Sequence, residues 1–234
     1  MAKNLIIGCG RFHVRLNPDW PTGAERIDSK LNAFGIESDI VYITEDHLFD
    51  YSQYDSFVIS GSNASVYDDA PWIARLVDIV RDIIASGKPL LGICFGHQII
   101  AEALGGAVSK CTLGWEVGAY ALDLCAAAYS SPLFSGIKNK DVVYQSHQDI
   151  VTSLPDGAVE LARTDKGIQA FSYSDSVYGL QFHPEFDYVF IKELKEIFKQ
   201  KNMVDYHDGS DLDVKSSLGL VFFENFIKII NHTV

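Results

Sequence analysis

The chain has 234 residues and a formal net charge of −12, with 47% hydrophobic and 21% charged residues, which suits one α/β domain of ordinary globular composition. The acidic balance argues against nucleic acid and anionic membrane surfaces as partners, because both attract proteins through Lys and Arg. No signal sequence or membrane span is recognisable, and none of the four cysteines forms a C-x-x-C pair, so we expect a cytoplasmic protein with reduced thiols and no zinc motif.

The first half of the chain alternates predicted strands and helices. Short apolar runs predict strands at 5–9, 38–43, 56–60 and 90–93. Thr22 and Glu25 form a capping box before a helix that is predicted to reach Phe34. Pro71 opens a second helix with an apolar period near 3.6, which Gly87 ends. This alternation indicates a parallel sheet with helices on both faces, so we expect a three-layer, flavodoxin-like, mostly parallel α/β fold.

The second half is richer in strands. They are predicted at 117–124, 142–145, 159–163, 168–173 and 177–183. Residues 174–176 read as a hairpin turn, which adds a small antiparallel section to the sheet. After Glu185 the pattern indicates a helix at 190–201, then a polar loop around 208–210, and then a last helix at 217–230. We therefore expect a single domain over residues 1–234, with a C-terminal helical extension at 186–234 packed on it.

The most informative segment is the turn 92–96, Gly-Ile-Cys-Phe-Gly, between an apolar strand and a helix. This G-x-nucleophile-x-G layout is that of a nucleophile elbow with cysteine in place of serine. Its sharp turn exposes one side chain and brings backbone so close that glycines are needed on either side. The free N–H groups of the following helix favour a thiolate, and the Phe95 N–H can serve an oxyanion. A buried core cysteine is the alternative, but the flanking glycines favour a functional Cys94.

A thiolate enzyme needs a base and a group that orients it. His183-Pro184-Glu185 ends the last strong strand, and residues i and i+2 on a strand share a face, so the Glu185 carboxylate is expected near the ring of His183. Pro184 favours an extended backbone at His183. Ligand crevices of α/β sheets lie outside the carboxyl ends of the strands, where Cys94 and His183 can meet. His147 also closes a strand and is the rival base.

Two separated motifs, in this order, resemble those of the class I glutamine amidotransferases. They are GICFGHQ at 92–98 and His-Pro-Glu at 183–185. The flanking segments resemble the subgroup similar to the glutaminase part of GMP synthase, and they lie at 59–62, 65–69 and 146–149. Free-standing members of this subgroup also resemble the γ-glutamyl peptidases. The match covers roughly residues 57–185.

The resemblance implies a hydrolase for a small-molecule substrate, either glutamine or a γ-glutamyl compound, that works without metal or cofactor. Cys94 would attack the side-chain amide carbon and form a glutamyl thioester. His183 would take and return the proton, and Glu185 would orient His183. Glutamine and a γ-glutamyl amide present the same carbonyl, so the chemistry at Cys94 would be the same for both.

The resemblance also implies an oxyanion hole made by the N–H of Phe95 and one N–H of the Gly61-Ser62 loop. The family usually has two adjacent glycines in this loop, so Ser62 leaves open which amide faces the oxyanion. The implied substrate-binding residues are Gln98, Ser146, His147 and Asp149, of which the Asp149 carboxylate would attract the substrate's amino group.

Two alternatives to a self-sufficient hydrolase stay open. No ATP-using synthetase domain is recognisable, and there is no G-x-x-x-x-G-K-[S/T] loop, so released ammonia would pass to a separate synthetase or be lost. The chain would then be a partner-activated or non-catalytic glutaminase-like subunit of a complex. A general cysteine protease or redox protein shares the elbow, but neither class explains Gln98 or the His-Pro-Glu segment.

Overall fold

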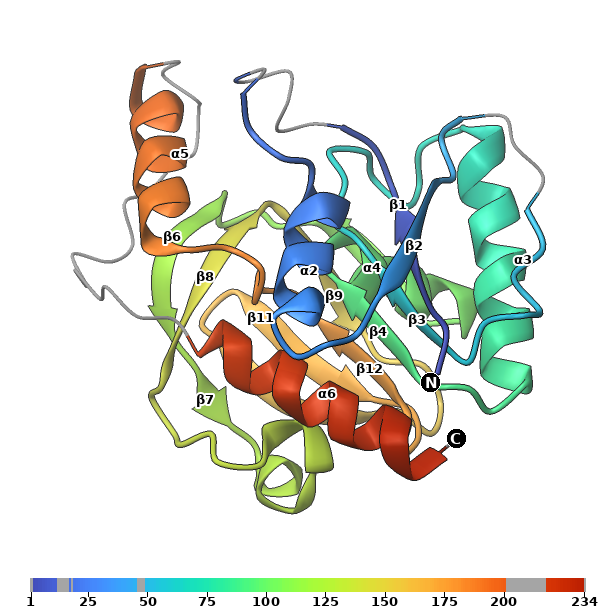
Figure 1. Ribbon diagram of the computed structural model, residues 1–234. Helices are drawn as coiled ribbons and strands as arrows, with labels where there is room; N and C mark the ends of the chain where they lie inside the picture. Colours follow the sequence, from blue (N-terminus) through green and yellow to red (C-terminus); the bar gives the residue numbers. More distant parts are fainter. Residues whose placement is uncertain (1, 12–16, 18, 46–48, 201–217, 234) are drawn as a thin grey trace.

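An eight-stranded sheet forms the centre of the computed structural model, which describes residues 2–11, 17, 19–45, 49–200 and 218–233 (Figure 1). Its strands in chain order are β1 (Asn4–Gly8), β2 (Ser38–Tyr42), β3 (Ser56–Ile59), β4 (Leu90–Ile93), β7 (Asp123–Leu124), β10 (Val159–Thr164), β11 (Gly167–Ser172) and β12 (Val177–Leu180). Their spatial order is β2-β1-β3-β4-β12-β11-β10-β7.

The sheet has a parallel part and an antiparallel part. Strands β2, β1, β3, β4 and β12 pair in parallel, in the 2-1-3-4-5 order of flavodoxin-like folds. Strands β11, β10 and β7 extend it with antiparallel pairs. The predicted fold class is therefore confirmed, including the antiparallel section.

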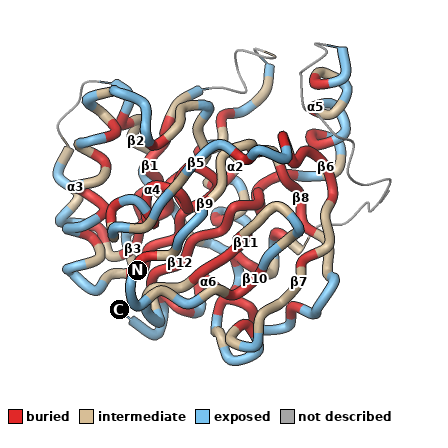
Figure 2. Tube along the Cα trace, turned by 180° about the vertical axis from the view of Figure 1, so that it is seen from behind, coloured by how far each residue is buried: buried red, intermediate tan, exposed pale blue. Residues whose placement is uncertain are grey.

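Helices cover both faces of the sheet. They are α2 (Gly23–Asn32) and α6 (Gly219–Thr233) on one face, and α3 (Pro71–Ala85) and α4 (Phe95–Ala103) on the other (Figure 1). Alternate residues of β1 serve the two layers, since Ile6 packs with α2 and α6 whereas Leu5 and Ile7 pack with α3 and α4. The central strands consequently appear as a buried band in Figure 2.

Two small two-stranded antiparallel sheets and a further helix complete the fold. The sheets pair β5 (Ala107–Lys110) with β9 (Asp149–Ser153), and β6 (Glu116–Ala121) with β8 (Val142–His147). Helix α5 (Tyr188–Gln200) packs on β6 through an apolar cluster that includes Val117, Phe190 and Leu194. The two C-terminal helices thus pack in different places, α5 over β6 and α6 over the central sheet. The polar loop predicted at 208–210 lies outside the described residues.

Local signals set the start of α2 better than its end. The capping box is confirmed, because Thr22 Oγ1 accepts from the Glu25 N–H and the Glu25 carboxylate accepts from the Thr22 N–H. The helix ends at Asn32, however, before the predicted last residue Phe34, whose side chain is exposed. Gly35 adopts φ 78° and turns the chain away, so Phe34 never joins the buried face.

Two predicted strands had wrong bounds, and two observed strands were not predicted. The strand predicted at 177–183 stops at Leu180, and the one predicted at 117–124 is split into β6 and β7. Strands β5 and β9 were not predicted, because their partly exposed residues show no clear alternation. Within the described part of the chain, no helix is both long and apolar enough to cross a membrane.

Candidate active site

The candidate nucleophile occupies a strained turn between β4 and α4. Cys94 has φ 53° and ψ −102°, a conformation that a non-glycine residue adopts only at a cost, and its side chain is 6% exposed. A Cβ at Gly92 would clash with the carbonyl oxygen of Gly96, and a Cβ at Gly96 would lie 2.5 Å from the carbonyl oxygen of Ile59. Both glycines are therefore required by close backbone approach, as the elbow motif predicts.

Cys94 differs from the other cysteines in its surroundings. Burial raises the pKa of the Cys9 thiol far above its ordinary value. Burial and the nearby charge of Glu160 raise the pKa of Cys125. Cys94 instead lies at the N-terminus of α4, and its interaction with the buried side chain of His183 raises the pKa of that histidine. Of these three cysteines, Cys94 is thus the one whose position favours reaction over inert packing.

The structure brings His183 and Glu185 together. His183 Nδ1 and Glu185 Oε1 are 2.7 Å apart, and both side chains are at most 5% exposed. The geometry is not the strand alternation that the sequence suggested, because β12 ends before both residues. They lie instead on a turn, in which the Phe186 N–H donates to the His183 carbonyl at 3.3 Å. The His183 N–H donates to the carbonyl of Tyr144 in β8 and so anchors the turn.

The His183 ring is held in its charged form. Burial disfavours that form, but the negative charges of Glu185 and Cys94 outweigh burial and raise the pKa of His183 to about 10. Phe186 stacks on the ring with centroids 4.0 Å apart and planes at 5°, which also suits a cation. His183 Nε2 has no fully formed hydrogen bond within the described residues, which leaves its proton available to the sulfur.

The loop after β3 closes the other side of Cys94. A Cβ on Gly61 would lie 3.2 Å from His183 Cε1 and 3.5 Å from Cys94 Cβ, so the loop backbone passes against both side chains. Ser62 turns its hydroxyl toward its own loop and accepts from the Ala64 N–H. Phe95 begins α4 directly after Cys94 and is fully buried. Gly61 and Phe95 thus border the nucleophile through their backbone, and Ser62 follows Gly61 in the same loop.

The expected substrate-binding residues lie on β8, β9 and α4 around the nucleophile. Cys94 Sγ is 4.0 Å from the carbonyl oxygen of Ser146. Gln98 is buried, and its amide nitrogen donates to the Asp149 carbonyl at 2.9 Å and to Gln181 Oε1 at 3.1 Å. Both side-chain N–H groups of Gln98 therefore bind other residues of the protein, and one of them holds the main-chain carbonyl of Asp149.

His147, the rival base, is bound to a carboxylate that the sequence analysis passed over. Its Nε2 lies 3.0 Å from Glu116 Oε2, and its Nδ1 lies 3.2 Å from the Asp149 carbonyl oxygen. Burial alone would raise the pKa of Glu116, but hydrogen bonds from His147 and Thr164 lower it. The available signal was a charged residue directly before the apolar run that begins at Val117.

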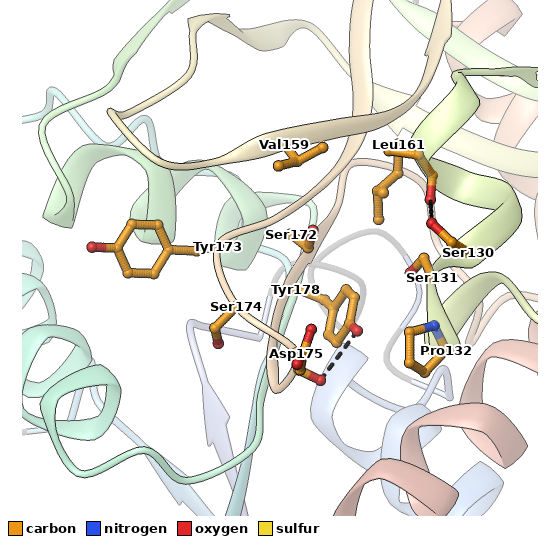
Figure 3. A pocket seen from close by; sticks show the side chains of 11 residues that line it. Ser130, Ser131, Pro132, Val159, Leu161, Ser172, Tyr173, Ser174, Asp175 and Tyr178 are labelled. Carbon is orange, nitrogen blue, oxygen red and sulfur yellow. Dashed lines mark hydrogen bonds between the residues drawn. The ribbon is translucent and has the colours of Figure 1, made fainter.

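One open pocket lies away from this site. It has a volume of about 300 Å³ and is lined by residues of η1 (Ala126–Ser130), β10 and β11, with Tyr178 and Asp175 near the start of β12 (Figure 3). Cys94 follows the carboxyl end of the parallel strand β4, so the two places lie toward opposite ends of the sheet. Among the described residues, no group of three or more His, Cys, Asp or Glu side chains could hold a metal ion.

Two classes of curated relatives resemble the chain. A γ-glutamyl peptidase 5 of Arabidopsis thaliana is 35% identical over 59% of this chain and 56% of that protein. A glutamine-hydrolyzing GMP synthase of Pyrobaculum aerophilum is 40% identical over 55% of this chain and 23% of that protein. The chain thus spans about half the length of the plant peptidase and less than a quarter of the synthase.

Solved structures share the fold over nearly the whole chain. A glutamine amidotransferase of Thermotoga maritima superimposes with a TM-score of 0.76 at 19% identity, covering 99% of this chain and 97% of that one. One from Methylobacillus flagellatus gives 0.77 at 20% identity, covering 98% and 95%. The family model described as glutamine amidotransferase class-I matches residues 23–189, which include the elbow and the His183–Glu185 pair. The chain therefore belongs to the class I glutamine amidotransferase family.

Proposed function

We propose that the chain hydrolyses the side-chain amide of glutamine or a γ-glutamyl amide bond, with Cys94 as nucleophile. The observation that carries this proposal is the strained elbow of Cys94 beside a buried His183–Glu185 pair. Nucleophile, base and orienting carboxylate are the three parts of a catalytic triad. One curated relative is named a γ-glutamyl peptidase and another is named glutamine-hydrolyzing, and both substrates present the same carbonyl.

In the first half-reaction, the Cys94 thiolate attacks the γ-carbonyl carbon, and the carbonyl electrons move to the oxygen. The N–H of Phe95 and an amide of the Gly61–Ser62 loop stabilise this oxyanion. The tetrahedral intermediate collapses as His183 Nε2 gives its proton to the leaving nitrogen. Ammonia or an amine leaves, and a γ-glutamyl thioester remains on Cys94.

In the second half-reaction, neutral His183 removes a proton from water as the water oxygen attacks the thioester carbon. Collapse of the second intermediate releases glutamate and restores the Cys94 thiolate beside the His183 imidazolium. Glu185 keeps Nδ1–H in place throughout, so that Nε2 faces the reacting atoms. Water is the only co-substrate that the two half-reactions consume. Ammonia released from glutamine is free to reach a separate synthetase.

Release of glutamate from glutamine and from a panel of γ-glutamyl peptides tests the proposal. The purified chain should act on at least one of them, Cys94→Ala should be inactive, and Cys125→Ala should match the unaltered chain as a control. Equal activity of Cys94→Ala and the unaltered chain would refute Cys94 as nucleophile. Absence of all activity would instead favour a partner-activated or non-catalytic subunit.

A further inference from the structure

Asp149 is held by four hydrogen-bonding contacts from different parts of the chain. His147 Nδ1 and Gln98 Nε2 contact its main-chain carbonyl at 3.2 and 2.9 Å. Its carboxylate accepts from Ser65 Oγ at 2.5 Å and from the Tyr67 hydroxyl at 3.0 Å, one on each oxygen. The backbone and the side chain of Asp149 are thus fixed separately, which gives the carboxylate a defined direction.

The two hydroxyls belong to the loop that contains Gly61 and Ser62, one of whose amides is expected in the oxyanion hole. Residues 60–70 connect β3 to α3, and Gly61 in this loop packs against the nucleophile. Ala64 is tied to Ser62 by a hydrogen bond, and Ser65 is tied to Asp68. The loop that contacts Cys94 through Gly61 therefore also binds the Asp149 carboxylate, through Ser65 and Tyr67.

The Asp149 carboxylate retains room for a charged donor. A carboxylate offers about four acceptor positions, and the two hydroxyls use one on each oxygen. Within the described residues, no lysine or arginine forms an ion pair with it, so its charge is oriented by neutral donors and not neutralised. Such a group suits an ammonium that brings both charge and hydrogen-bond donors.

We infer that Ser65 and Tyr67 are positioning residues, which hold the Asp149 carboxylate toward the α-ammonium group of a γ-glutamyl substrate. This inference rests on the proposed function. It adds that recognition of the amino group and placement of the oxyanion loop depend on one hydrogen-bonded unit. Removing either hydroxyl frees the carboxylate to turn away and weakens binding of substrates that carry an α-amino group.

A matched pair of ligands tests the inference, because glutaramate is glutamine without its α-amino group. The Tyr67 side chain is 53% exposed, so Tyr67→Phe removes one hydroxyl without opening the core. We expect this variant to raise the KM for glutamine by about tenfold, the order of one hydrogen bond to a charged group. The inhibition constant of glutaramate and the melting temperature should stay unchanged.

Two further variants sharpen the test. Tyr129→Phe is the control, since Tyr129 is 69% exposed on η1, which packs against β10. Asp149→Asn should raise the same KM more strongly, and adding Tyr67→Phe to it should have little further effect because both act through one contact.

Equal shifts with glutamine and glutaramate, or no shift with either, would overturn the inference while leaving the proposed function intact. No turnover of glutamine or γ-glutamyl peptides by the unaltered chain would refute the proposed function and this inference with it.

Discussion

Glu185→Gln removes one negative charge from the candidate active site and leaves the shape of the side chain nearly unchanged. Glu185 Oε1 is 2.7 Å from His183 Nδ1, and the Glu185 side chain is almost fully buried. The amide oxygen of glutamine can still accept from Nδ1–H, so the ring keeps its orientation. The substitution therefore separates the charge of Glu185 from its role in orienting the base.

The expected loss of activity follows from the opposing contributions to the pKa of His183. Burial lowers its pKa, and Glu185 is the largest of the opposing causes that raise it to about 10. Without that charge we expect the pKa of His183 to fall, because burial is then opposed chiefly by Cys94. A smaller share of the protein would then carry the imidazolium at neutral pH. Loss of the charged acid should slow hydrolysis by roughly 10²- to 10⁴-fold.

Two measurements check this expectation. The first is the pH dependence of glutamate release, and the second is the pH dependence of the melting temperature. Because the folded-state pKa of His183 is raised, its stabilising contribution is complete below about pH 6.5 and is lost as the pH rises through about 10. The unaltered chain should therefore exceed Glu185→Gln in stability most at about pH 6, with a difference that shrinks toward about pH 10. Activity within threefold of the unaltered chain, with the same pH profile, would refute the reasoning.

Three further perturbations have expected outcomes. Gly92→Ala should lower the melting temperature strongly, since its Cβ clashes with backbone, whereas Gly23→Ala, whose Cβ would have no neighbour nearer than 3.8 Å, should change it little; similar losses would contradict this account of the elbow. Phe186→Leu removes the ring stacked on the candidate base, so the alkaline limb of the activity profile should move to lower pH, and an unmoved limb would argue against the stack. Glu116→Gln should destabilise the chain by a few kcal/mol at neutral pH. Because the pKa of Glu116 is lowered, this difference in stability should fade as the pH drops below about 4.5. Chemical denaturation at several pH values measures the difference, and a value that does not change with pH would contradict this prediction.

The elbow was predictable because its determinants are local. Gly92, Cys94 and Gly96 lie within five residues, and the same short turn that requires the glycines also places the nucleophile. The parallel part of the sheet was predictable because strand and helix patterns alternate along the first half of the chain. A boundary such as the end of α2 was harder, because packing, not local propensity, decides whether Phe34 is buried.

Contacts between distant segments could not be derived from the sequence pattern. Glu116 contacts His147 across the antiparallel pair of β6 and β8, and the sequence around either residue does not indicate which residue it contacts. Tyr67 reaches Asp149 from a loop 82 positions earlier. The His183–Glu185 contact was expected, but a turn forms it and not a strand, because β12 ends at Leu180.

Reaction with a γ-carbonyl electrophile shaped like glutamine, followed by peptide mass mapping, tests the central claim most directly. The label should appear on Cys94 and on no other of the four cysteines, with activity lost in proportion, and excess glutamine should protect. The Glu185→Gln variant should be labelled more slowly. Label on another cysteine, or complete loss of activity with Cys94 unmodified, would contradict the assignment of Cys94 as nucleophile.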